Sequence, residues 1–154
     1  MYRRIETLID SIYAECGMIS ELSKGLTPDS DLGKTISDVK TFRAICFGEQ
    51  TIGEAVIQLG RLTQNRLFEL YPNINWNAIK GMKNHIVHEY LDIDSHTILY
   101  TALNDIPVLK KTITKIKNDI QSNKLNKLLY YIDYAQRNKG FQIPSMGIKN
   151  GKNR

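Results

Sequence analysis

Residues suited to chemistry stand close together between positions 83 and 90. In an α-helix, Asn84 and His88 lie about 40° apart around the axis and share one face, whereas Lys83 and Tyr90 lie about 20° apart on a neighbouring face. A histidine titrates near neutral pH and can move a proton, and a cation and an amide can stabilise negative charge that develops at phosphorus. These residue types suit metal-free cleavage of RNA, in which a base activates a ribose 2′-OH against the adjacent phosphate.

The same segment also has a structural interpretation. A helix that bears histidine and tyrosine is more often structural than catalytic. The other two histidines fit surface positions, because His85 lies about 60° from His88 around a helix and His96 stands at a helix start. Glu54 and Arg61, on the preceding helix, could support the segment across a bundle, although an exposed helix face explains them equally well.

Helical periodicity predicts an all-α protein around this segment. Apolar residues recur at steps of three and four over residues 3–23, 36–70, 76–90 and 95–120, which is typical of one buried stripe on each helix. Residues 124–137 could add a short fifth, C-terminal helix. Four helices with short connections favour an up-down four-helix bundle.

Caps and breakers predict where these helices begin and end. Asn75 has the side chain of an N-cap for the third helix, and Pro107 lies inside the fourth, where it removes a hydrogen bond and should kink the helix. Beyond the last periodic residue the chain is rich in Gly, Asn and Lys. We therefore expect one helical domain over residues 1–137 and a flexible, basic tail over residues 138–154.

Composition excludes several classes of protein. The chain has 154 residues, of which 42% are hydrophobic and 24% charged, and no apolar run approaches the roughly 18 residues of a membrane span. Charges on both sides of Ile5 are unlike a signal peptide. Cys16 and Cys46 lack the spacing of a zinc site or a disulfide framework. We expect a reduced, cytoplasmic protein with no membrane anchor, metal or other cofactor.

Charge is distributed unevenly along the chain. Residues 1–109 carry 10 basic and 14 acidic side chains (net −4), whereas residues 110–154 carry 11 basic and two acidic ones (net +9). Clustered cations bind polyanions by releasing condensed counterions, yet a solvated basic helix and tail would show the same composition. Tyr130, Tyr131 and Tyr134 could stack on bases or simply pack the short fifth helix.

A wider set of residues resembles a known family. The stretches 51–55, 70–76, 79–90 and 104–107, together with Asp94, are similar in order, spacing and residue type to the HepT family of the HEPN superfamily. Members of this family are ribonuclease toxins encoded beside a minimal nucleotidyltransferase antitoxin, MntA. The resemblance covers roughly residues 3–120.

The resemblance implies roles for individual residues. The family motif is an arginine, four residues, a histidine, one residue and a tyrosine, and a polar residue usually follows the arginine. His88 matches the catalytic histidine, Asn84 the polar residue, and Tyr90 the tyrosine to which the partner enzyme attaches AMP. Lys83 stands where the family has arginine. Lysine keeps the positive charge but cannot make the two parallel hydrogen bonds to phosphate that a planar guanidinium makes.

Two functions are compatible with this resemblance. The first is a homodimeric, metal-independent endoribonuclease toxin, in which both copies of His88 line one cleft and Lys83 helps to hold the phosphate. A cognate MntA-like nucleotidyltransferase would silence it by adenylylating Tyr90, and Arg61 or Arg66 could supply the guanidinium that the motif lacks. The second function, which Lys83 favours, is a non-catalytic helical binding subunit that partners a nucleotidyltransferase.

Overall fold

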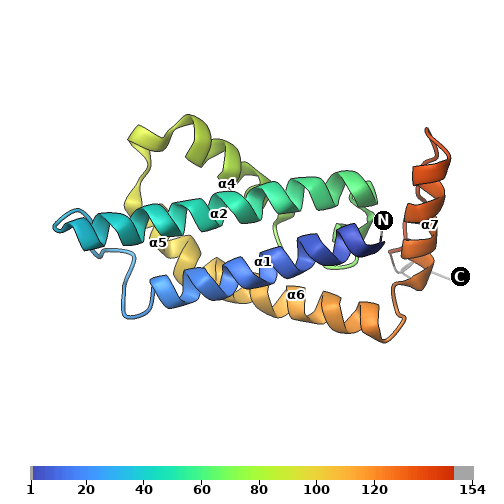
Figure 1. Cartoon of the computed structure of the whole chain (residues 1–154), viewed down its shortest axis with the longest axis horizontal. Coiled ribbons are helices and arrows are strands. Elements are labelled where there is room, and N and C mark those ends of the chain that lie inside the picture. The colour runs from blue at the N-terminus through green and yellow to red at the C-terminus, as the bar shows by residue number, and fades with distance from the viewer. Residues whose placement is uncertain (1, 148–154) are drawn as a thin grey trace, which may run out of the picture.

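Every regular element within residues 2–147, the part of the chain that the structure describes, is helical (Figure 1). The structure is a computed structural model. Its α-helices are α1 (Tyr2–Leu22), α2 (Ile36–Thr63), α3 (Arg66–Glu69), α4 (Trp76–His88), α5 (Ser95–Tyr100), α6 (Ile106–Gln121) and α7 (Asn126–Arg137). Helices α1, α2, α4 and the α5–α6 pair form the predicted bundle, and α7 is the predicted short C-terminal helix. None of these helices combines the length and apolar character needed to cross a membrane.

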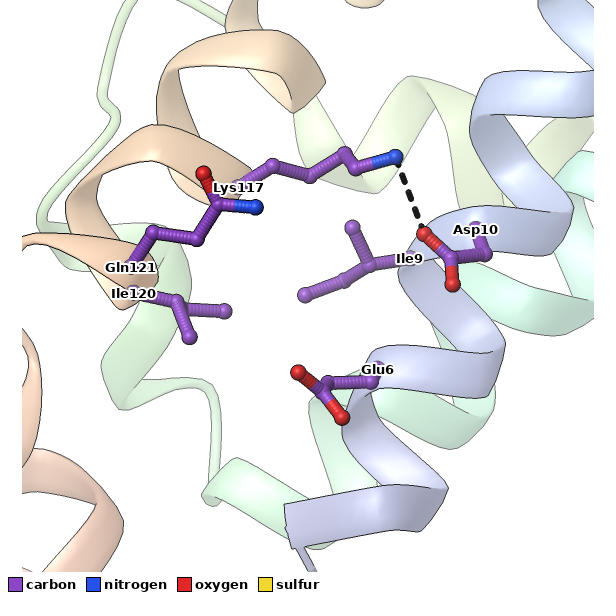
Figure 2. Close-up of a pocket in the computed structure, with 6 residues that line it drawn as sticks. All are labelled: Glu6, Ile9, Asp10, Lys117, Ile120 and Gln121. Carbon is purple, nitrogen blue, oxygen red and sulfur yellow. Dashed lines mark ion pairs between the residues drawn. The ribbon is translucent and has the colours of Figure 1, made fainter.

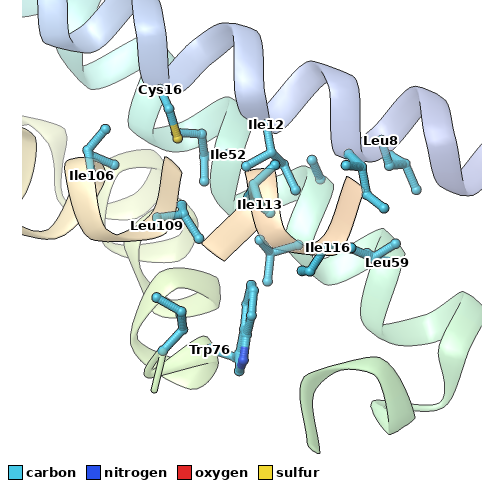
Figure 3. Close-up of a cluster of buried hydrophobic side chains, with 14 of the residues drawn as sticks. Leu8, Ile12, Cys16, Ile52, Leu59, Trp76, Ile106, Leu109, Ile113 and Ile116 are labelled. Atoms are coloured by element: carbon cyan, nitrogen blue, oxygen red, sulfur yellow. The ribbon is translucent and has the colours of Figure 1, made fainter. Parts of the chain in front are cut away.

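The core lies where the apolar stripes of α1, α2 and α6 meet, and Figure 3 shows this contact. Ile12, Ile52 and Ile113 are fully buried there, one from each helix. Burial of such a side chain stabilises the fold by about 1.5–3 kcal/mol. Six of the apolar residues predicted for the first stripe are buried, namely Ile5, Leu8, Ile9, Ile12, Cys16 and Ile19. The periodicity therefore identified the core face of α1 correctly.

The second predicted helix is interrupted. Gln64 and Asn65 have positive φ angles of 51° and 60°, so α2 ends at Thr63 and the short α3 follows. The Gln64 side chain accepts from the backbone N–H of Ile143 at 2.8 Å and donates to the carbonyl of Phe141 at 2.8 Å. These bonds from a distant part of the chain hold the break, so the prediction of one helix up to residue 70 was wrong.

The first part of the expected tail packs against the helices. Ile143 is fully buried, and Arg66 donates from Nε to its carbonyl at 2.7 Å. The ring of Phe141 stacks on Tyr131 with centroids 6.0 Å apart. Residues 141–146 thus pack against α2, α3 and α7, while residues 148–154 of the expected tail lie outside the described residues.

Helix α4 is fixed firmly at its start. The Asn75 side chain caps it by accepting from the N–H of Ala78, as predicted. Trp76 is buried, donates from Nε1 to the carbonyl of Tyr71 at 2.9 Å, and stacks on Phe68 with centroids 4.4 Å apart. The first turn of the helix that carries the motif is therefore part of the core.

The end of α4 differs from the prediction by two residues. The last helical residue is His88, and Glu89 leaves the helix with φ −124° and ψ 25°. Tyr90 consequently begins a separate 3₁₀ turn, Tyr90–Asp92. The expectation that Lys83 and Tyr90 share a helix face is wrong, because it assumed continuous helical geometry through residue 90.

Pro107 is accommodated by a wider helical turn. Residues Thr101–Asp105 form a π-helical turn between α5 and α6, in which the N–H of Ile106 donates to the carbonyl of Thr101. Proline lacks an N–H and its ring crowds the carbonyl four residues earlier. An inserted residue relieves that crowding, so the helix can continue into α6.

One carboxyl group is buried in the bundle. Glu49 of α2 is 1% exposed, and its Oε2 has no hydrogen-bond partner among the described residues. Burial, with a smaller contribution from the Asp105 carboxylate, raises the pKa of Glu49 to about 9. The side chain is therefore neutral at physiological pH and costs stability as the pH rises.

We predict that Glu49→Gln stabilises the protein more at about pH 8 than at about pH 5. The folded state holds the Glu49 proton up to a pKa of about 9, whereas a free carboxyl releases it near 4.5, so wild-type stability falls as the pH rises between these values. The neutral amide removes this dependence. Thermal unfolding at both pH values measures the stability change caused by Glu49→Gln, and Glu21→Gln, at an exposed position, is the control. An equal gain in stability at both pH values would contradict the prediction.

Candidate active site on helix α4

The backbones of α2 and α4 touch at Gly53. A Cβ atom placed on Gly53 would lie 2.9 Å from the Cβ of Lys83, 3.0 Å from the carbonyl oxygen of Ile79 and 3.1 Å from the N of Lys83. Real Cβ atoms do not approach other atoms so closely, so only glycine fits here. This contact places the Cβ atom of Lys83 directly against the backbone of α2.

Lys83 forms an ion pair with Glu54, the next residue of α2. Its Nζ lies 2.6 Å from Oε2 of Glu54, while Oε1 of Glu54 accepts from Nε2 of Gln58 at 3.0 Å. The Lys83 and Gln58 contacts lower the pKa of the Glu54 carboxyl. Glu54 is therefore ionised at neutral pH, and it both orients the motif cation and compensates its charge.

These side-chain contacts continue from Gln58 to Arg4, near the start of α1. The Arg4 guanidinium donates to Oε1 of Gln58. A groove of about 530 Å³ runs along these residues. Its polar lining is Arg4, Ser11, Gln50, Thr51, Glu54, Gln58 and Lys83. Two cations, one carboxylate, and amides and hydroxyls between them give a lining with net positive charge, which suits an anionic, hydrogen-bonding ligand such as a phosphodiester. Sequence reasoning missed Arg4, because no local pattern links position 4 to a motif on the fourth element of the bundle.

The two arginines proposed to replace the motif guanidinium lie elsewhere. Arg66 is engaged by the Ile143 carbonyl and pairs with Glu69 at 2.5 Å. Arg61 is exposed and lines a separate cavity with Lys80, although its charge adds a small lowering of the Glu54 pKa. Neither contacts Lys83, so Arg4 is the guanidinium that shares a groove with it.

Asn84, His88 and Tyr90 point away from the bundle. All three are exposed, and within the described residues the His88 imidazole makes neither a hydrogen bond nor an ion pair. The neighbouring His85 instead pairs through Nδ1 with Glu89 at 2.5 Å. Lys83 and His88 lie about 140° apart around α4, so one protomer does not bring the motif cation and imidazole together.

Apolar side chains are exposed beside the motif. Val87 is 46% exposed and Leu91 is 96% exposed, on either side of His88 in the sequence. In Figure 1 the end of α4 and the turn after it stand out from the other helices of the bundle. The motif therefore lies on a protruding, partly apolar surface.

Two other cavities suit an RNA site less well. Figure 2 shows one of about 210 Å³ between α1 and α6, where Lys117 reaches Asp10 at 3.0 Å and Glu6 adds a second carboxylate. A cavity of about 390 Å³ between α4 and α6 is largely apolar, with Ile79 and Leu109 in its lining. In the first of these cavities two carboxylates stand against one cation and repel phosphate, and the apolar wall of the second offers it no hydrogen bonds. Within residues 2–147 no group of three or more His, Cys, Asp or Glu side chains is arranged as a metal site.

Comparison with known proteins connects this arrangement to a family. The chain is similar to "Putative RNase MJ1216" of Methanocaldococcus jannaschii, with 34% identity over 51% of this chain and 62% of that protein. It is also similar to "Putative RNase TTE0752" of Caldanaerobacter subterraneus subsp. tengcongensis, with 29% identity over 70% of this chain and 89% of that protein. "Probable ribonuclease HepT" of Thermococcus cleftensis is 28% identical over 63% of this chain and 84% of its own length. No solved structure matches the chain significantly.

The family model described as "Ribonuclease HepT-like" matches residues 12–116, which is more than half of the chain. This match includes α2, the motif on α4 and the first part of α6, and it ends before α7. The chain therefore belongs to the family of HepT-like ribonucleases.

Proposed function

We propose that the protein is an endoribonuclease that cleaves RNA by attack of the ribose 2′-OH. The observation that carries this proposal is the exposed His88 at the end of α4, with Asn84 one turn before it on the same face. Membership of the HepT-like family and relatives named as RNases support it. The His88 imidazole can act as a base, and the Asn84 amide can donate a hydrogen bond to a phosphate oxygen.

The reaction needs two proton transfers. As the 2′-oxygen forms a bond to phosphorus, a neutral imidazole takes its proton; as the bond from phosphorus to the 5′-oxygen breaks, that oxygen takes a proton from an acid. The products are a 2′,3′-cyclic phosphate and a 5′-hydroxyl. Asn84 shares the face of His88 and stabilises the charge on the phosphate oxygens, and we propose that Lys83 and the groove cation Arg4 add to this stabilisation from the other protomer of a pair. One protomer offers His88 for only one of the two transfers.

A second copy of the chain supplies the other imidazole. We propose that two protomers pair through their protruding α4 ends, so that both His88 side chains line a shared cleft. Val87 and Leu91 are exposed in the single chain and would be covered in this arrangement. Burial of apolar surface is the general driving force of such pairing.

We predict that His88→Ala reduces RNA cleavage by about 100-fold or more, because general acid–base catalysis contributes roughly 10²–10⁴-fold. Activity should persist in EDTA, and the products should carry 2′,3′-cyclic phosphates. Cleavage of a labelled RNA by purified protein measures all three outcomes, with His96→Ala as the matched control. Equal rates for wild type and His88→Ala would exclude the proposal.

We also propose that the enzyme is a growth-blocking toxin in the cytoplasm and that a cognate nucleotidyltransferase silences it at Tyr90. In that step the Tyr90 oxygen bonds to the α-phosphorus of ATP, and pyrophosphate and the phenolic proton leave. Tyr90 is 42% exposed at the start of its 3₁₀ turn, two residues from His88, so an added nucleotide would occupy the proposed cleft.

We predict that co-expression with a nucleotidyltransferase encoded beside the gene adds one or more AMP units to Tyr90 and suppresses RNA cleavage. Mass spectrometry of the intact protein and its peptides measures the modification, and Tyr90→Phe is the matched control that cannot accept it. AMP on another residue, or modification that leaves cleavage unchanged, would overturn the prediction.

One observation favours a second function. Lys83 replaces the family arginine and is engaged by Glu54, which is compatible with a non-catalytic subunit that binds a nucleotidyltransferase. Lys83→Arg distinguishes the two functions, because a guanidinium can hold Glu54 and still present a second pair of donors to phosphate. A ribonuclease should gain activity from this change, whereas a binding subunit should not.

A further inference from the structure

The cations of the C-terminal part divide into two groups. Lys117 of α6 pairs with Asp10 and lies 4.6 Å from the ring centroid of Tyr13, which Lys110 also covers at 5.1 Å. Lys115 lies over the ring of Tyr71. These lysines serve the packing of α6 against its neighbours. Exposed cations without an ion pair among the described residues include Lys111 on α6, Lys127 and Arg137 on α7, and Lys139 after it; the last three lie beyond the family match, which ends at residue 116.

Helix α7 presents two of these cations in line with two aromatic rings. Lys127, Tyr130, Tyr134 and Arg137 fall within roughly 80° of one another around the helix axis. All four are exposed, with Tyr130 at 61% and Tyr134 at 37%, whereas Leu128 on the opposite face is buried. This set, which we call the α7 stripe, is about 15 Å long.

The rings of the α7 stripe are held in place. Tyr130 and Tyr134 lie 6.4 Å apart between centroids with their planes inclined by 30°, and Tyr134 meets the edge of Phe141 at 4.7 Å. Phe141 belongs to the ordered segment that Gln64 holds at the end of α2. Two nearly parallel, exposed rings on a fixed base lose little entropy when a flat ligand stacks on them.

We propose that the α7 stripe binds single-stranded RNA, with bases stacked on Tyr130 and Tyr134 and phosphates held by Lys127 and Arg137. Aromatic platforms flanked by cations are how proteins hold single strands without sequence preference, because every base has a flat face. The one acidic side chain of the helix, Asp133, is exposed about 40° from Arg137 around the axis, so two cations of the stripe stand beside one carboxylate. The backbone carbonyl of Asp133 accepts from Nε of Arg137 at 3.4 Å. This inference rests on the proposed function, since it takes RNA as the substrate, and it assigns α7 the capture of that substrate outside the cleavage site.

The test measures binding of a fluorescein-labelled oligouridylate by the full-length His88→Ala protein, so that the RNA stays intact. Tyr130→Ala and Tyr134→Ala should each weaken binding about tenfold, while Tyr130→Phe keeps the affinity. Tyr100→Ala is the matched control and should bind like its parent, because the exposure of this α5 tyrosine lies between those of Tyr130 and Tyr134. Lys127→Ala should make the plot of log binding constant against log salt concentration less steep by about 0.7, which is the contribution of one phosphate contact.

Two outcomes would overturn the inference. Unchanged affinity in the Tyr130→Ala, Tyr134→Ala double variant would show that the rings do not stack on RNA. Loss of a co-purifying protein from that variant, with RNA affinity intact, would assign the stripe to a protein partner instead. Failure of the proposed function is separate: it is an absence of His88-dependent cleavage, which leaves tyrosine-dependent RNA binding in place.

Discussion

The contact between α2 and α4 at Gly53 is the constraint on which the site depends. Because no side chain separates the two backbones, Lys83 is held against α2 and its ammonium meets Glu54. The rotation of α4 is fixed by the same contact. Asn84 and His88 then face solvent, and the helix cannot turn His88 inward without losing the contact at Gly53.

This geometry separates the chemical tasks of the motif. The cation belongs to a groove shared with Arg4, while the imidazole belongs to a protruding surface that also exposes Leu91. Under the proposed function a single chain offers an incomplete site, and this separation supports the proposed pairing of two copies. In the basic C-terminal part, Lys110 and Lys117 of α6 pack on the Tyr13 ring of α1, whereas Lys127 and Arg137 of α7 are exposed.

Sequence alone predicted the features that depend on local patterns. The stripe of α1 and the Asn75 cap follow from spacing and residue type, so the bundle was predictable. The break at Gln64 was not, because its hydrogen-bond partners lie 77 and 79 residues further along the chain. Likewise, the approach of Arg4 to the groove depends on packing between helices, which no motif encodes.

The direct test of this account compares two glycine-to-alanine substitutions. Gly53→Ala should lower the melting temperature by about 2–4 °C per kcal/mol lost and speed amide hydrogen exchange in α4, because the new methyl group pushes that helix away. Gly81→Ala, with open space around its Cβ in the same helix, should be neutral or stabilising by up to about 1 kcal/mol. If both substitutions stabilised the protein equally and left exchange in α4 unchanged, the contact at Gly53 would not be what positions the motif.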